Sequence, residues 1–470
     1  MLCVRPVLFG ATLLAILGQA SLALAQDVTC YVDSVQGDDT KSGLSEAEAI
    51  KSQAKIDKTC TVVKYKRGSV FPEEAVKISS KAKVYTNYGD PGLPLPRFEK
   101  TRSPNNGSIV SSYQGGITID GLYLAGSQSE NSMSNLMSGV CVMLGGNSKL
   151  INSEITNCDI GIMLFSSGSL VQNNYVHDLH VSVDAQPGVD ANVVGGAEGI
   201  FVNGPDNEVA YNTFVRCAES ADWQSGQCDG GATEVSIPAN STLSGVKIHH
   251  NYSYQSCGFF EVSSVTNASN PVKGVFSDSE FYNNVSVDSG WLSLLQVCNT
   301  DLSNIRWENN TIVQHKGSLR AGMLVAVYTG LGSGMTGGDL VQDVVFWTNN
   351  LFVGDGVTFQ TPHKNIVQQS NLIISTAKQD PGFVNLAGTA ATDFDLVQTS
   401  PAVNAGTLLA NRTLDYLNRT IPDPSGEPDI GAFEYGSTQV TPPPTPAIGG
   451  AGGSPPGTGG TTATPAGTER

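Results

Sequence analysis

The chain has few basic residues. Its 470 residues include 26 Lys and Arg against 43 Asp and Glu, which gives a formal net charge of −17 and a pI of about 4.7. A surface of this sign repels phosphate backbones and anionic lipid headgroups. We therefore expect no nucleic-acid partner and no binding to an anionic membrane. A polyanionic substrate would need a bound cation or a local basic patch.

Several motifs are also missing. The sequence has no Gly-rich phosphate loop, no Gly-x-Ser-x-Gly elbow and no Cys-x-x-Cys pair, which argues against nucleotide, serine-hydrolase and dithiol chemistry. After the first 25 residues no apolar run is long enough to span a bilayer. The repeated segments show no helical apolar period. These absences predict a protein built from strands, with no membrane insertion.

What the sequence does contain is a repeat. An aliphatic strand, a two-residue corner, a second short strand and a Gly-led third strand recur, with gaps of 38, 39, 33, 26 and 40 between corners. The second residue of each corner is Asn174, Asn212, Asn251, Asn284, Asn310 or Asn350. Repeats of roughly 20–50 residues are typical of solenoids, whose units bury their apolar faces only by stacking. The pattern predicts an all-β fold, a single parallel β-helix.

The Asn corners have a structural explanation. Asn tolerates the left-handed backbone of a sharp bend, and its amide can bond the backbone of the next coil. We interpret the corners as stacked ladders that hold coils together, not as a functional motif.

The two ends differ from the repeat. Residues 1–25 have a basic residue, an apolar stretch and a small-residue cleavage site, and they predict a secretory signal peptide. Residues 26–436 form the expected β-helix domain. Residues 437–470 consist largely of Pro, Gly, Thr and Ser, a composition that cannot bury enough apolar surface to fold. We expect a secreted, extracellular monomer with a disordered tail.

Eight cysteines remain once Cys3 is assigned to the signal peptide. An even number in an oxidising compartment favours disulfides over metal ligation. Cys30 and Cys60 bracket the N-terminal segment, and Cys217 and Cys228 flank a short loop, so we expect these two pairs. The connectivity of the others stays open.

Three stretches resemble a known superfamily. They are CYVDSVQGDDTKSGLSEAEAIKSQAKI from Cys30, then VYTNYGDPGLP, and near the C-terminus SPAVNAGT with PDIGAFEYG. Ser45 and Glu48 in the first have the spacing of a capping box before a short helix. Together the stretches resemble secreted right-handed β-helix proteins of the pectin-lyase-like superfamily, whose bacterial members share the closing segment. The resemblance implies a right-handed β-helix with a short N-terminal capping helix. Because that superfamily contains lyases, hydrolases, epimerases and proteins of no known activity, it leaves the reaction open.

A pair of carboxylates is the main catalytic candidate. The strands GGATEVSI and GFFEVSS, aligned on their glycines, place Glu234 and Glu261 at the same position. Because side chains alternate, their flanking residues should point inward and both Glu outward. Adjacent strands lie about 4.8 Å apart, so the carboxyl groups should be close. Carboxyl groups roughly 5–5.5 Å apart are the geometry of retaining glycosidases. A calcium site and an acidic stack without function are the alternatives.

Two long insertions predict a binding face, residues 181–198 and 219–230. We expect Glu198, Asp222 and Trp223 to bind substrate, with Trp223 stacking on a sugar ring. Asp229 is a third catalytic candidate, because a wider carboxylate pair would suit an inverting mechanism. A solvated acidic loop is the alternative.

The basic residues predict structure more than catalysis. Four residues before each corner's second position stand Glu208, Lys247, Glu280 and Arg306. Alternating charges in one column predict a salt ladder. Arg216 should likewise align with Asp178.

Four of the six histidines form pairs, His177 with His180 and His249 with His250, but no third metal ligand is evident. A metal site is therefore left unassigned.

The sequence thus predicts a secreted carbohydrate-active β-helix protein that cleaves glycosidic bonds of an extracellular polysaccharide. Hydrolysis by Glu234, Glu261 and Asp229 is favoured over elimination, because carboxylates cluster there and the bases have partners. Two alternatives stay open: a polysaccharide lyase acting by β-elimination on a uronate-containing polymer, and a non-catalytic glycan-binding surface protein. Hydrolysis requires no cofactor, and Ca²⁺ remains possible.

Overall fold

The fold is known from a computed structural model. The structure describes residues 27–101, 108–127, 139–179, 197–217, 230–238, 240–264, 274–296, 300–316, 345–355, 366–424 and 426–444. The predicted signal peptide and the candidates Asp222, Trp223 and Asp229 lie outside these residues, as does His180.

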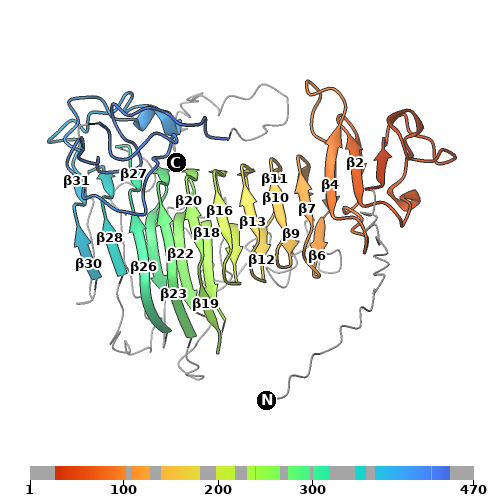
Figure 1. The fold of residues 1–470 in the computed structure, drawn as a ribbon, viewed down its shortest axis with the longest axis horizontal. Coiled ribbons are helices and arrows are strands. Elements are labelled where there is room, and N and C mark those ends of the chain that lie inside the picture. The colour runs from red at the N-terminus through yellow and green to blue at the C-terminus, as the bar shows by residue number, and fades with distance from the viewer. Residues whose placement is uncertain are drawn as a thin grey trace, which may run out of the picture.

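The chain winds into a right-handed parallel β-helix with three sheets, as predicted (Figure 1). Sheet A contains β1 (Thr29–Val32), β2 (Val62–Lys66), β4 (Val84–Tyr88), β7 (Thr118–Asp120), β10 (Lys149–Ile151), β13 (Leu170–Gln172), β16 (Glu208–Ala210), β20 (Lys247–His249), β23 (Gly274–Tyr282), β26 (Thr300–Glu308), β28 (Val345–Thr348) and β30 (Ile366–Gln369), with β19 (Thr242–Ser244) beside β23.

The other strands form two further sheets. Sheet B contains β3 (Val70–Pro72), β5 (Arg97–Thr101), β8 (Tyr123–Ser127), β11 (Glu154–Thr156), β14 (Tyr175–His177), β17 (Thr213–Val215), β21 (Tyr252–Tyr254), β24 (Val285–Val287), β27 (Thr311–Val313), β29 (Leu351–Val353) and β31 (Leu372–Ile374). Sheet C contains β6 (Val110–Ser112), β9 (Val140–Leu144), β12 (Ile160–Leu164), β15 (Ala197–Val202), β18 (Gly230–Ile237), β22 (Gly258–Ser264) and β25 (Trp291–Gln296).

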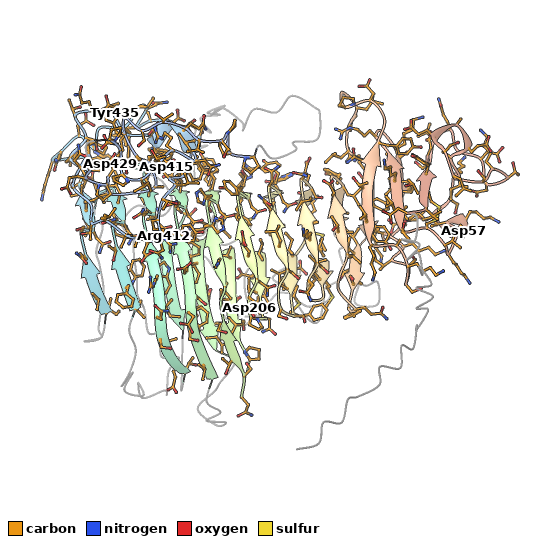
Figure 2. The ribbon with its side chains drawn as sticks, in the orientation of Figure 1. Asp57, Asp206, Arg412, Asp415, Asp429 and Tyr435 are labelled. Atoms are coloured by element: carbon orange, nitrogen blue, oxygen red, sulfur yellow. A yellow bond between two sulfur atoms is a disulfide. The ribbon has the colours of Figure 1, made fainter. Side chains whose placement is uncertain are left out.

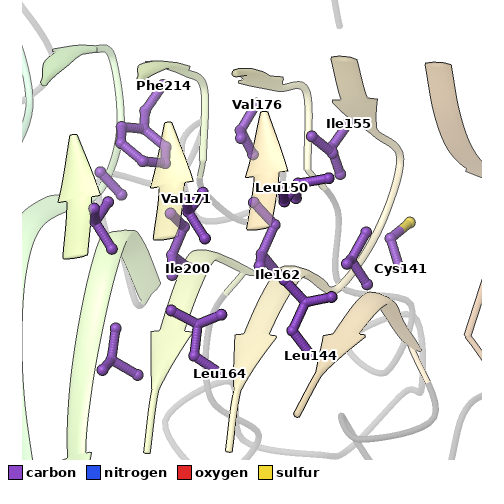
Figure 3. Close-up of a cluster of buried hydrophobic side chains, with 14 of the residues drawn as sticks. Cys141, Leu144, Leu150, Ile155, Ile162, Leu164, Val171, Val176, Ile200 and Phe214 are labelled. Carbon is purple, nitrogen blue, oxygen red and sulfur yellow. The ribbon is translucent and has the colours of Figure 1, made fainter. Parts of the chain in front are cut away.

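The core is a continuous stack of inward side chains from all three sheets. Figure 3 shows Leu150 of sheet A, Val176 of sheet B and Ile162 of sheet C meeting inside the coils. Towards the C-terminus the stack becomes aromatic, and the Trp307 and Trp347 rings lie 4.9 Å apart and 3° from parallel. Each coil therefore buries its apolar residues against its neighbours, as a solenoid must.

In each corner between sheets A and B, the first residue makes the bend and the second joins neighbouring coils. The first residue takes the left-handed conformation, with φ of 59° at Asn173 and 55° at His250. The second is a buried Asn whose amide bridges coils: Asn251 Oδ1 accepts from the Asn212 backbone N–H at 2.9 Å, and Asn251 Nδ2 donates to Asn284 Oδ1 at 3.1 Å. The predicted Asn ladder is confirmed.

The N-terminal part differs from the prediction in detail. The Cys30–Cys60 disulfide is confirmed. The expected capping helix is replaced by two 3₁₀ turns, η1 (Glu46–Glu48) and η2 (Gln53–Lys55), and the Ser45 side chain makes no cap hydrogen bond, so the predicted capping box is wrong. The backbone of Ile50 bonds to Tyr31 at 3.1 Å, and this bond ties the chain to β1 directly after the turn.

The predicted Cys217–Cys228 disulfide is also wrong. Cys217 is a free thiol buried in the apolar core, because the corner before it turns the side chain inward. Cys141 pairs with Cys158. Cys257 is disulfide-bonded too, and its partner lies outside the described residues.

Residues 375–444, here called the C-terminal segment, fold over the outer face of sheet B from β21 to β31 (Figures 1 and 2). This segment includes η6 (Ala391–Phe394). Tyr211 Oη donates to Asn418 Oδ1 at 2.8 Å, and Asn349 Nδ2 donates to the Thr407 carbonyl at 2.8 Å. The segment thereby covers about half of the outer face of sheet B. Its contacts with sheet B do not involve the strands of sheet C. In the described part of the chain no helix is long and apolar enough to cross a membrane.

Candidate active site

The predicted carboxylate pair forms on sheet C. Glu234 of β18 and Glu261 of β22 are direct register partners in parallel strands. Both are partly exposed, whereas Thr233, Val235 and Phe260 are each 1% exposed and fill the interior. The alternation predicted from the sequence is therefore correct, and both Glu lie on the outer face.

A hydroxyl group lies against one member of the pair. Ser263, two residues after Glu261 on β22, donates to Glu234 Oε1 at 2.5 Å. A hydrogen bond donated to a carboxylate stabilises its charged form. Glu234 therefore has a hydroxyl donor on the neighbouring strand.

Glu198 lies on the preceding strand of the same sheet. Its register partners are Ile160 of β12 and Gly231 of β18, so it sits three residues before the position that Glu234 occupies. It is 5% exposed, which makes it more buried than the pair. Its predicted role in substrate binding stays a prediction, as do those of Asp222, Trp223 and Asp229.

The strands of sheet C carry no basic side chain. In the seven described strands of this sheet there is no Lys, Arg or His. These strands therefore supply no Lys, Arg or His that could act as a general base and abstract a proton.

The predicted salt ladder lies on sheet A and is only partly correct. Glu208, Lys247, Glu280 and Arg306 are successive register partners, as expected. The short ion pairs go elsewhere, however. Glu208 Oε1 lies 3.2 Å from His249 Nε2, and Glu280 Oε1 lies 3.3 Å from Arg412 Nη2. Among the described ion pairs none involves Lys247, because the imidazole and the C-terminal segment supply closer partners.

Sequence reasoning missed a charged network on sheet B. His177 Nδ1 lies 2.7 Å from Asp178 Oδ2, and its Nε2 lies 3.2 Å from Glu154 Oε1. Arg216 forms an ion pair with Asp178, which confirms the predicted alignment of these two residues. Tyr175 stacks on the imidazole with ring centroids 4.2 Å apart. The alternation of side chains along β14, which puts Tyr175 and His177 on one face, could have indicated this network.

Charges shift the protonation of this network. Burial opposes the charge on His177, but hydrogen bonds to Asp178 and Glu154 outweigh it and raise the pKa of the imidazole. Burial likewise works against the Asp178 charge, yet bonds from His177 and Arg216 lower the pKa of its carboxyl group. Both ring nitrogens of His177 are engaged, so we interpret the network as an ion cluster that joins coils and not as a metal site.

Several ionisable side chains of the C-terminal segment, among them Arg412 and Asp429 (Figure 2), are partly or fully buried. Burial raises the pKa of Asp429 to about 6 and that of Glu434 to about 8. Both carboxyl groups accept backbone N–H groups, for example those of Asn404 and Tyr435 at Asp429. Arg412 lies between Glu308, at 2.7 Å, and the Tyr282 ring, at 3.7 Å from the centroid. Within the described residues, no group of three or more His, Cys, Asp or Glu could hold a metal ion.

Comparison with known proteins agrees with the fold. Residues 98–229 match the family model described as a right handed beta helix region. The predicted right-handed β-helix fold is therefore confirmed. No curated protein matches the chain.

Solved structures with a similar fold are distant in sequence. The pectate lyase Pel9A is 14% identical, with 86% of this chain and 96% of that chain covered and a TM-score of 0.44. XylC in complex with xylose is 10% identical, with 87% and 98% covered and a TM-score of 0.46. The GH136 lacto-N-biosidase from Eubacterium ramulus is 11% identical, with 73% and 67% covered and a TM-score of 0.32. The site must therefore be argued from its own residues.

Proposed function

We propose that this chain is a secreted carbohydrate-active enzyme that hydrolyses glycosidic bonds of an extracellular polysaccharide. The observation that carries the proposal is the register of β18 and β22, in which Glu234 and Glu261 are direct neighbours on an outer face. Neighbouring strands lie about 4.8 Å apart. That spacing suits a retaining mechanism, which uses carboxyl groups roughly 5–5.5 Å apart.

Ser263 suggests how the two roles divide. Its hydroxyl group donates to Glu234 Oε1 and favours the ionised carboxylate there. We assign Glu234 as the nucleophile that attacks the anomeric carbon. Glu261 then protonates the leaving glycosidic oxygen and later takes a proton from the water that releases the sugar. Asp229 remains the proposed base for an inverting alternative, and Glu198, Asp222 and Trp223 are proposed to bind substrate.

Hydrolysis is favoured over β-elimination by the composition of sheet C. Elimination requires a base that removes the proton beside a uronate carboxyl group. Lyases of the pectin-lyase-like superfamily, which the sequence resembles, use Lys or Arg as this base. The described strands of sheet C offer carboxylates and no Lys or Arg. The hydrolytic mechanism needs no cofactor.

The disulfides support an extracellular location. Cys30–Cys60 and Cys141–Cys158 are of the kind that form and persist outside the reducing cytosol. Together with the predicted signal peptide at residues 1–25, they support secretion.

The test is turnover of a polysaccharide panel by the full chain, followed through new reducing ends and through the ultraviolet absorbance of unsaturated uronates. We expect reducing ends without that absorbance. Glu234→Gln and Glu261→Gln should each lower kcat by about 100-fold or more and leave the strand spectrum unchanged. Glu208→Gln, an outward carboxylate of sheet A, is the matched control and should keep full activity.

Azide can assign the roles. A Glu234→Ala variant in azide should yield a glycosyl azide of inverted configuration, because azide takes the place of the missing nucleophile. Unsaturated products, or full activity in both Gln variants, would refute the proposed hydrolase.

A further inference from the structure

We infer that the outer face of sheet C is built to bind an uncharged polysaccharide and not a polyuronate. This inference rests on the proposed function, since it names the substrate class of the same site. It comes from two features that the catalytic assignment does not use: the apolar side chains that lead to the carboxylate pair, and the distribution of basic residues in this half of the chain.

The first feature is an apolar column in line with the carboxylates. On the N-terminal side of Glu234 its successive register partners are Phe201, Met163 and Met143, one from each coil. Phe201 and Met143 are partly exposed, and they pack against a small apolar cluster that is separate from the interior core. A substrate lying along the axis of the β-helix would thus pass from apolar contacts to the catalytic pair.

Two aromatic rings extend this surface. Tyr113, directly after β6, is 67% exposed, and its ring lies 5.6 Å from that of Phe165 at 45°. The Tyr113 hydroxyl group lies 3.7 Å from Met143 Sδ, so the rings are continuous with the apolar column. The coil between them carries Gly145, where a Cβ atom would lie 2.7 Å from the Tyr113 carbonyl oxygen. The glycine lets the two coils approach closely beneath the rings.

The length of this surface fits a chain of sugars. Tyr113, Phe165, Phe201 and Glu234 come from the first, third, fourth and fifth coils of sheet C. With coils about 4.8 Å apart, the surface runs roughly 19 Å along the axis before it reaches Glu234. It therefore suits an oligosaccharide more than a single sugar.

The second feature is a lack of cations. Residues 103–246 contain 14 Asp and Glu but only two Lys and Arg, Lys149 and Arg216, besides His177 and His180. Lys149 lies in β10 of sheet A, and Arg216 is paired with Asp178 beside sheet B. Neither belongs to a strand of sheet C, and the described strands of that sheet carry no Lys or Arg that could pair with a row of sugar carboxylates.

The apolar column and the lack of Lys and Arg together favour a neutral sugar chain over a charged one. The C–H faces of neutral sugar rings can pack on the apolar surfaces of Tyr, Phe and Met. A polyuronate would place a negative charge beside an acidic, partly apolar surface, where it would be repelled and poorly compensated. A polyuronate would need calcium ions that bridge its carboxylates to those of the protein, so binding is measured with and without calcium.

The experiment measures binding without turnover. The full chain carrying both Glu234→Gln and Glu261→Gln is titrated calorimetrically with neutral oligosaccharides from β-glucan, xylan and mannan, and with oligogalacturonates and oligomannuronates with and without calcium chloride. We expect a neutral series to bind more tightly as its chain grows, and the uronates not to bind in either condition. Tyr113→Ala should weaken binding by up to about tenfold. Tyr123→Ala, a matched change on sheet B, should leave it unaltered.

The possible failures are distinct. Uronate binding as tight as neutral binding, with or without calcium, would overturn the inference, and so would binding of no probe by a folded variant. Tyr113→Ala without effect would overturn the proposed surface. If a neutral series binds but the unmodified enzyme releases no reducing ends from it, the hydrolase proposal fails while this inference stands.

Discussion

Carboxylates on the outer faces of this β-helix have two kinds of surroundings. On sheet B, Glu154 and Asp178 lie against His177, and Arg216 pairs with Asp178, so charges of both signs meet within one cluster. On sheet C, the register partner of Glu234 is another carboxylate, and the described strands supply no basic residue. The first arrangement joins neighbouring coils, and the second is the one on which the proposed hydrolysis depends.

The protonation of His177 should make stability depend on pH. Its pKa is raised above the ordinary 6.5 by the bonds to Asp178 and Glu154, which outweigh burial. The folded state therefore holds the proton more tightly than the unfolded chain. This contribution is fully present below about pH 6.5 and is lost as pH rises through the folded-state pKa. Urea unfolding between about pH 5 and pH 9 should show the loss in the unmodified protein and not in His177→Gln. Identical pH profiles would contradict the proposed network.

At the scale of the strands, the corners made the fold predictable. Only one strand register agrees with the side-chain period of two, the bends that favour Asn and the recurring Gly. In that register Glu234 and Glu261 are direct partners, as predicted. Local patterns were weaker evidence. The spacing of Ser45 and Glu48 matched a capping box, yet the chain leaves that turn at once to bond with β1. Cys217 lies near Cys228 in sequence, but its side chain faces the core.

The Asn ladder should be strongest in its middle. Asn251 bonds to Asn212 below it and to Asn284 above it, and it is 0% exposed. Asn251→Ala would leave several buried partners unsatisfied, each costing about 1–3 kcal/mol, so we expect a loss of about 3 kcal/mol or more in the free energy of unfolding. Asn371→Ala, at the partly exposed last rung, is the matched control and should cost less. Denaturant titration measures both, and equal losses would argue against a cooperative ladder.

At the scale of the whole molecule, the C-terminal segment connects distant parts of the chain. It covers the outer face of sheet B from β21 to β31, and its contact between Tyr211 and Asn418 joins residues 207 positions apart. No local pattern in the sequence signals such a contact, which is why the sheet A ion pairs were misassigned: Arg412 reaches Glu280 from this segment. The candidate site was predictable because it depends on neighbouring strands, whereas its loop residues Asp222, Trp223 and Asp229 depend on long insertions, where strand periodicity gives no position.

The end of the C-terminal segment can be located by truncation. Composition predicts no folded tail after residue 436, yet residues up to Val440 bond back to the loop that carries Asn418 and Arg419. Val440 N donates to the Asn418 carbonyl at 2.9 Å, and Gln439 Nε2 donates to that of Leu417 at 2.9 Å. Removing residues 445–470 should therefore leave the melting temperature unchanged.

Removing residues 437–470 should instead lower stability. At about 1 kcal/mol for each lost hydrogen bond, we expect a fall of about 2 kcal/mol or more. Part of this loss would arise indirectly, because the freed loop also holds Arg419 against Asp395 at 2.8 Å. Differential scanning calorimetry of the two truncated proteins separates the effects. Equal melting temperatures would show that residues 437–444 do not stabilise the segment, and a fall already in the shorter truncation would show that residues beyond 444 do.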